Sequence, residues 1–316
     1  NMVKSGVTDF TYTVGSSIDE NWVDAIRMIR ALKGSHVGII GSHAHGFFNV
    51  GVDELAMYQK FGVIVDHYDL TDLWNTSAKP ELVEKYKSIM LGAFDVSSIA
   101  AEKQAKVAEL AAKFRTFAEE RALTAIALRC WPEFAAGYGI APCAAMSVVQ
   151  SDDLLLSCEG DLDCAITMIA HRAAGAETPF MADLSQVNIE DNSALMWHCG
   201  VAPCNLSDGV CNCTLDTYHA GGRGVTAGFV MKSGLMNMSR LDSVYGHYRM
   251  FNRRGEALPM AKELSGTYAK VRFEQPMQSL LDDVVYSGLA HHVSMVYGDF
   301  SKPFAIFSRL KGLEVL

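Results

Sequence analysis

The first 175 residues alternate between stretches of helical apolar spacing and short, continuous apolar runs. Helical spacing is found in four stretches, at 19–32, about 52–61, 79–91 and 98–120. Short β-rich runs lie between or after them, at 36–41, 63–68 and 123–128. Strands that alternate with helices pair in parallel, and the helices cover the sheet. We therefore predict a doubly wound, parallel-sheet α/β domain over residues 1–176.

The pattern changes after Gly175. Helical periodicity fades, and short strand-like segments stand between Gly, Ser, Asn and Pro residues, as at 224–232, 237–244, 269–273 and 291–297. Frequent turn residues between short apolar runs favour neighbouring β-strands. We predict a mostly β, barrel-like C-terminal domain over residues 177–316.

Composition narrows the classes of function. The chain has 316 residues, of which 49% are apolar and 20% charged, and its net charge is −9. A large core is expected, and the acidic balance argues against a nucleic-acid partner. No apolar stretch approaches the roughly 20 residues that a membrane-spanning helix needs, which argues against a membrane partner. Eight cysteines without a secretory signal indicate reduced thiols and a cytoplasmic protein.

The densest group of candidate site residues is the run Cys158–Cys164, which contains Glu159, Asp161 and Asp163. It follows the apolar segment 154–156 and begins a helical stretch. Ligands of open α/β sheets bind outside the carboxyl ends of the strands, so Glu159 lies where a site is expected. The alternative is that these acids only favour a helix N-terminus.

A second acid, Asp183, lies in the otherwise apolar run 179–184. A carboxylate in such a run needs a partner, a metal or a cap, unless it faces solvent on an edge strand. His198 and the pair His291-His292 come later, and adjacent strand residues point to opposite faces. Two acids with one or two histidines form a mixed oxygen and nitrogen set, which suits Mn²⁺, Mg²⁺ or another divalent cation.

Other clusters are less specific. Cys204, Cys211 and Cys213 suggest a zinc site but lack a fourth ligand. Trp131 lies in the run Cys130–Phe134, directly after the third strand, where an aromatic ring, a thiol and a carboxylate reach a sheet edge. The chain has neither a phosphate-binding loop nor a dinucleotide fingerprint, so a nucleotide site is not supported.

Four motifs in order resemble the fucose isomerase-like proteins, which include L-fucose and L-arabinose isomerases. They are Glu-Gly-Asp at 159–161, Phe-Met-Ala-Asp at 180–183, His-Cys-Gly at 198–200 and the Ala-His-His…Gly-Asp run at 290–299. The resemblance covers nearly the whole chain. Members of that group usually carry another α/β domain before the part seen here.

The resemblance implies a metal-dependent aldose–ketose isomerase that acts on an open-chain sugar through a cis-enediol. It implies Mn²⁺, or another divalent cation, held by Glu159, Asp183 and one of His291 and His292, of which we favour His291. Glu159 and Asp183 would also be the catalytic acid–base residues. We assign His198, His292 and Trp131 to substrate binding.

The resemblance also implies a homo-oligomer, either a trimer or a hexamer.

Two alternatives to the isomerase function remain open at this point. One is a sugar-binding or regulatory relative that has lost turnover, and the other is a structural zinc protein built on the cysteines.

Overall fold

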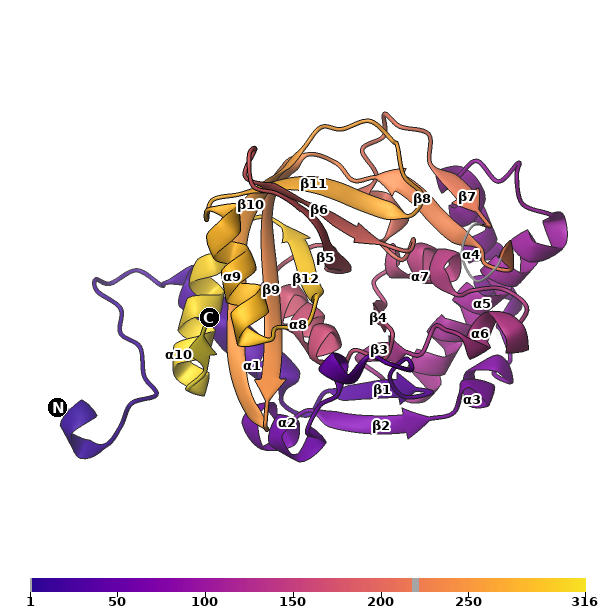
Figure 1. The fold of residues 1–316 in the computed structure, drawn as a ribbon. Helices are drawn as coiled ribbons and strands as arrows, with labels where there is room; N and C mark the ends of the chain where they lie inside the picture. The colour runs from indigo at the N-terminus through magenta and orange to yellow at the C-terminus, as the bar shows by residue number, and fades with distance from the viewer. Residues whose placement is uncertain (1, 218–221) are drawn as a thin grey trace.

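The computed structural model describes residues 2–217 and 222–316 of the chain (Figure 1). Its first layer is a parallel sheet of four strands in the order β2-β1-β3-β4. The strands are β1 (His36–Ile40), β2 (Ile64–Tyr68), β3 (Ala125–Leu128) and β4 (Leu155–Cys158). Strands β3 and β4 are buried along their whole length, as expected for a sheet with helices packed against it.

Eight helices belong to this part of the described chain. They are α1 (Glu20–Leu32), α2 (Glu54–Phe61), α3 (Leu70–Trp74), α4 (Pro80–Ala93), α5 (Ala101–Glu120), α6 (Glu133–Gly137), α7 (Cys143–Gln150) and α8 (Leu162–Ala173). Helices α3 to α7 gather at one end of the molecule (Figure 1). Helix α8 lies between the two sheets, because it contacts β1, β3 and β4 of the first and β5, β9 and β12 of the second.

The second sheet closes on itself. Its strand order is β13-β10-β9-β12-β5-β6-β11-β8-β7, and an additional pairing of β10 with β11 joins the sheet into a barrel. The strands are β5 (Phe180–Asn188), β6 (Ser193–His198), β7 (Thr214–Asp216), β8 (Thr226–Val230), β9 (Gly234–Val244), β10 (His247–Leu258), β11 (Thr267–Phe273), β12 (His292–Tyr297) and β13 (Glu314–Val315).

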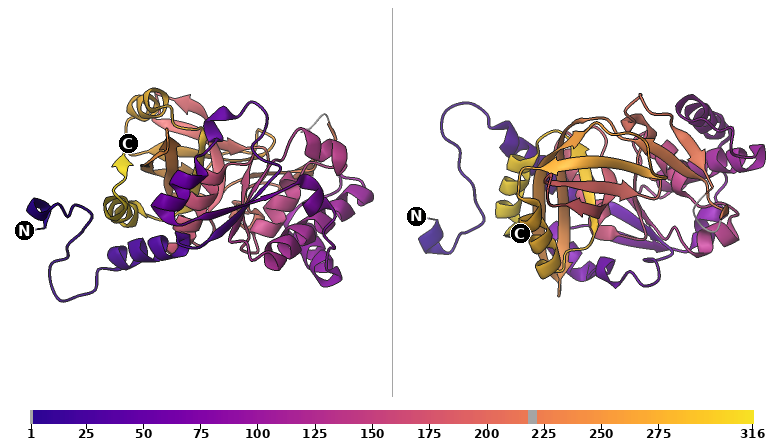
Figure 2. Two further views of the ribbon diagram at one scale, coloured as in Figure 1. Left: turned by 90° about the horizontal axis from the view of Figure 1, so that it is seen from below. Right: turned by 45° about the horizontal axis from the view of Figure 1, so that its top comes forward.

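Two further helices, α9 (Met277–Ser287) and α10 (Ser301–Lys311), lie beside β9 and β10 on the outside of the barrel (Figure 1). Short 3-10 helices of the described residues lie at Val3–Ser5, Phe48–Val50 and Cys204–Leu206. The segment before α1 loops out from the body of the molecule (Figures 1 and 2), and the carbonyl of its Phe10 accepts from Arg309 of α10 at 2.9 Å.

The predicted fold class is confirmed, since a parallel sheet with helices is joined to a mostly β, barrel-like region. Helices α9 and α10 are additions that the fading helical pattern after residue 175 did not indicate. The division into domains at residue 176 stays a prediction. Among the described helices, none combines the length and the apolar character needed to cross a membrane.

Candidate active site

The turn from β4 into α8 holds the first site residue in an unusual backbone conformation. Glu159 and Gly160 have φ values of 61° and 78°, in the left-handed region. Asp161 then caps α8, because its Oδ1 accepts the backbone N–H of Cys164 at 2.8 Å. The backbone N–H of Ala44 donates to the carbonyl of Glu159 at 2.9 Å, which attaches the turn to the loop after β1.

Barrel strands bring the other carboxylate and an imidazole to the same place. Strands β5 and β12 are antiparallel neighbours, and their register sets Asp183 directly opposite His292. His292 Nε2 lies 2.9 Å from Glu159 Oε2 and 3.4 Å from Asp183 Oδ1. Three residues that are up to 133 positions apart therefore meet around one nitrogen atom.

His291 is the half-buried neighbour of this group. Its ring centroid lies 4.1 Å from that of His292, and its Nδ1 is 3.2 Å from Asn49 Nδ2. Phe47, from the same loop as Asn49, stacks on His292 with the ring centroids 6.3 Å apart and makes a tilted contact with His291 at 5.7 Å. Burial and the neighbouring His292 lower the pKa of His291. One ligand atom each from Asp183, His291 and His292 lie within 4.8 Å of one another.

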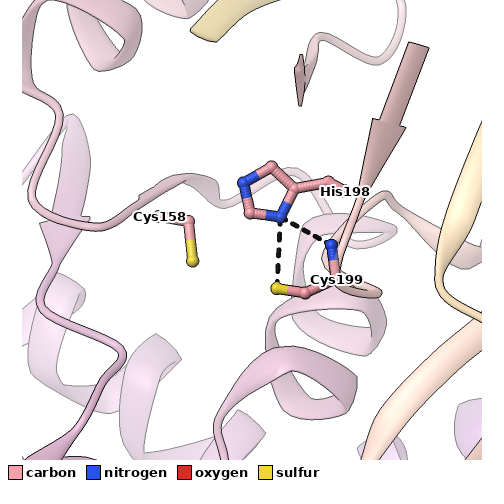
Figure 3. A group of neighbouring side chains, drawn as sticks. All are labelled: Cys158, His198 and Cys199. Atoms are coloured by element: carbon pink, nitrogen blue, oxygen red, sulfur yellow. Dashed lines mark hydrogen bonds between the residues drawn. The ribbon is translucent and has the colours of Figure 1, made fainter. Parts of the chain in front are cut away.

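His198, at the end of β6, lies between the Glu159–His292 pair and two buried thiols. Its Nδ1 lies 2.9 Å from the backbone nitrogen of Cys199 and 3.2 Å from the Cys199 thiol (Figure 3). The Cys158 thiol is also close to the ring (Figure 3). Ligand atoms of Glu159, His198 and His292 form a second group within 4.8 Å.

The charge of the site is set by a buried ion-pair network. Asp161 Oδ2 accepts from His292 Nδ1 at 2.9 Å and from Arg240 at 2.7 Å, and Arg240 also pairs with Asp242 at 3.1 Å. Burial alone would raise the pKa of Asp161, but Arg240 and His292 outweigh it, so Asp161 is a carboxylate. Burial alone would lower the pKa of His292, but the neighbouring carboxylates of Asp161 and Glu159 raise it.

These atoms match the donor set of a divalent cation. Asp183 Oδ1 and His292 Nε2 are buried and have no hydrogen-bond partner among the described residues, and the same is true of His198 Nε2 at the edge of the group. Buried polar atoms without partners are rare in folded proteins and indicate an ion, a ligand or water. Two carboxylate oxygens lie beside His292 Nε2, so either a proton or a cation has to lie between them. Carboxylate oxygen and imidazole nitrogen suit Mn²⁺ and related ions.

Other sequence candidates lie apart from this group. Trp131 follows β3, is 40% exposed, and has no hydrogen bond or ring contact with the group within the described part of the chain. Glu133, from the same run, pairs with Arg129 at 2.6 Å. The sequence also suggested a zinc site at Cys204, Cys211 and Cys213. Among the described residues, no group with metal-ligand spacing contains any of these cysteines.

Several residues of the site were not identified from the sequence. Asp161 was read only as a helix-start acid, and neither Asn49, Phe47 nor Arg240 was singled out. The sequence shows Asp161 in the Glu-Gly-Asp run directly before a helical stretch, but it does not show the contacts of this carboxylate with His292 and Arg240. Arg240 lies in the run Met238–Asp242, which has an ordinary strand composition and carries no local sign of a site.

No family model matches the chain. Three curated relatives are named sulfoquinovose isomerase. The one from Alkalicoccus urumqiensis is 26% identical over 302 residues, which cover 93% of this chain and 66% of that protein. The one from Priestia megaterium is 27% identical over 299 residues, covering 92% and 66%. The one from a Clostridium species is 22% identical over 321 residues, covering 96% and 71%.

The similarity therefore runs through almost the whole chain, which spans just under two thirds of the length of the first two relatives. This similarity supports the expectation from the sequence that the chain is related to sugar isomerases. The names of these relatives point to a different sugar from L-fucose or L-arabinose.

Proposed function

We propose that this chain carries the metal-binding and proton-transferring residues of an aldose–ketose isomerase that acts on an open-chain sugar. The observation that supports the proposal best is the convergence of Glu159, Asp183 and His292 on one buried point. The similarity to three proteins named as sugar isomerases supports the same reaction class.

In this proposal Glu159, Asp183 and a histidine hold Mn²⁺ or another divalent cation. The resemblance favoured His291, whereas the distances favour His292, because its Nε2 lies beside both carboxylates. His291 remains a neighbour that can add a ligand, although its Nδ1 is within reach of Asn49. When bound, the cation would act as a Lewis acid toward the two sugar oxygens, O1 and O2.

The carboxylates are the candidates for proton transfer. Conversion of an aldose to a ketose moves a proton from C2 to C1 and another between O2 and O1, through a cis-enediol. Glu159 and Asp183 flank the same point, so one carboxylate can take the carbon-bound proton while the other assists transfer between the oxygens. His198 Nε2 faces this point and would bind a sugar oxygen, and Trp131 remains a proposed substrate-binding residue at the sheet edge.

The names of the relatives make sulfoquinovose the first sugar to test, ahead of L-fucose and L-arabinose. A homo-oligomer, trimeric or hexameric, remains part of the proposal.

Isothermal titration of the purified chain with Mn²⁺ tests the metal site. We expect one site, and we expect Glu159→Gln to lower the affinity at least about tenfold because a charged ligand is lost. Glu133→Gln is the matched control, since Glu133 also follows a strand of the same sheet but pairs with Arg129 instead. It should leave the affinity unchanged.

Activity is tested by ketose formation from sulfoquinovose, L-fucose and L-arabinose with Mn²⁺ present. Absence of Mn²⁺ binding by the intact protein would overturn the proposal. Sugar-dependent thermal stabilisation without any product would instead indicate the sugar-binding or regulatory relative.

A further inference from the structure

We propose that the two buried histidines of the site are held in opposite tautomers, with Asp161 and the backbone amide of Cys199 as the groups that impose them. His292 then presents a lone pair at Nε2 and acts as a ligand. His198 presents an N–H at Nε2 and acts as a hydrogen-bond donor to a sugar oxygen. The roles of ligand and donor rest on the proposed function, whereas the tautomers themselves do not.

The tautomer of His292 follows from its contact with Asp161. A carboxylate can only accept hydrogen bonds, so the 2.9 Å contact between Asp161 Oδ2 and His292 Nδ1 requires a proton on Nδ1. Neutral His292 therefore has its lone pair on Nε2, the atom that lies beside Glu159 and Asp183. Hydrogen bonding of one ring nitrogen to a carboxylate is a common way to orient a metal-binding imidazole.

Arg240 holds both members of this pair in place. Its guanidinium is fully buried and donates to Asp161 Oδ2 at 2.7 Å and to the backbone carbonyl of His292 at 3.0 Å. Asp161 Oδ1 is also occupied, because it accepts from the Cys164 amide at 2.8 Å. The carboxylate can therefore neither rotate nor pick up a proton without breaking other buried contacts.

The tautomer of His198 follows from the opposite kind of contact. A backbone N–H can only donate, so the 2.9 Å contact between the Cys199 amide and His198 Nδ1 requires an unprotonated Nδ1 (Figure 3). The Cys199 thiol, 3.2 Å away, can donate to the same atom. The proton of neutral His198 is therefore on Nε2, which is buried without a partner among the described residues. A nitrogen that carries a proton cannot ligate a cation.

Asp161→Asn should reverse the tautomer of His292. At the Oδ1 position the new NH₂ group would meet two donors, from Arg240 and the Cys164 amide, and neither can become an acceptor. At the Oδ2 position it would meet one fixed donor and the imidazole, which can accept by moving its proton to Nε2. The amide therefore favours the second position, and the proton on Nε2 then blocks the ligand lone pair.

Long-range ¹H–¹⁵N correlation spectra of the metal-free, ¹⁵N-histidine-labelled chain test the tautomers directly. Signals are assigned by their loss in His292→Gln and His198→Gln. We expect a protonated Nδ1 on His292 and a protonated Nε2 on His198. Asp161→Asn should move the His292 proton to Nε2 and lower the affinity for Mn²⁺ by about 10- to 100-fold.

Asp163→Asn is the matched control. Asp163 lies on the same buried helix start, but it bonds with Tyr248 at 3.0 Å and Ser243 at 3.3 Å rather than with a histidine. This variant should change neither the tautomers nor the Mn²⁺ affinity.

An unprotonated Nδ1 on His292, or a protonated Nδ1 on His198, in the unaltered chain would overturn the proposal, and this measurement needs no variant to fold. So would an Asp161→Asn protein that folds and keeps the original His292 tautomer. If both tautomers are as expected but the chain binds no Mn²⁺, the proposed function fails while the tautomer assignment stands.

Discussion

Gly160→Ala tests the turn that carries Glu159. Gly160 has a φ of 78°, and a left-handed backbone costs an L-residue roughly 1–2 kcal/mol. An added Cβ would also lie 2.4 Å from the Ser42 carbonyl oxygen and 2.5 Å from the His43 Cα. These are backbone atoms and cannot rotate away, so overpacking adds about 1–3 kcal/mol. We expect a total loss of about 2–5 kcal/mol in the free energy of unfolding.

The matched control is Gly175→Ala. Gly175 has a φ of 98°, but an added Cβ there would have no heavy atom within 4 Å. It should therefore lose only the backbone contribution of roughly 1–2 kcal/mol. The difference between the two variants isolates the cost of the close contact at Gly160.

Urea unfolding followed by circular dichroism measures both free energies by linear extrapolation. The loop after β1 must move to admit the new methyl group, and the Ala44 amide of that loop bonds with the carbonyl of Glu159. Gly160→Ala should therefore also weaken Mn²⁺ binding, whereas Gly175→Ala should not. Equal losses of stability in the two variants would refute the packing of this loop against the turn.

Two further predictions concern the buried charges. Burial raises the pKa of Asp163 to about 7, above the ordinary value of 3.8, so the folded protein keeps a proton that the unfolded chain releases. Its contribution to stability should fall as pH rises from about 4 to 7, by at most about 1.4 kcal/mol per pH unit, and Asp163→Asn should remove that slope. Urea unfolding of the unaltered chain and of Asp163→Asn between about pH 4 and 7 checks this prediction. Parallel pH profiles of the free energy of unfolding would contradict it. Arg240→Met should cost about 3–5 kcal/mol, because it leaves the buried carboxylate of Asp161 without its cation. Arg254→Met, which removes two surface ion pairs, should cost much less, and equal losses would disprove the argument.

The elements of the first 175 residues could be predicted because their signals are local. The helix expected at 19–32 is α1 (Glu20–Leu32), with Asp19 as its cap, and the strand expected at 123–128 is β3 (Ala125–Leu128). Periodicity, caps and glycine stops lie within a few residues of one another, so no knowledge of the tertiary fold is needed.

The C-terminal elements were less visible. Strand β10 (His247–Leu258) contains Arg249, Arg253 and Arg254, which interrupt the apolar alternation. In the structure these side chains are satisfied by carboxylates from other segments, such as Asp242 and Asp283, and no local pattern shows this. Helix α9 did carry signals, because Pro276 precedes it and Gly288 follows it, but the segment was read within a β-rich context.

The sequence by itself determined which residue types were available for the site. Glu159 after a buried strand, Asp183 in an apolar run and the adjacent pair His291-His292 all stand out without a structure. It could not decide between the two histidines, because neighbouring strand residues point to opposite faces and either face can be the inner one. The pairing of β12 with β5 sets His292 opposite Asp183, and this is why our proposal prefers His292. The same holds for Asp161 and Arg240, whose contact joins residues 79 positions apart and exists only after the barrel has closed over α8.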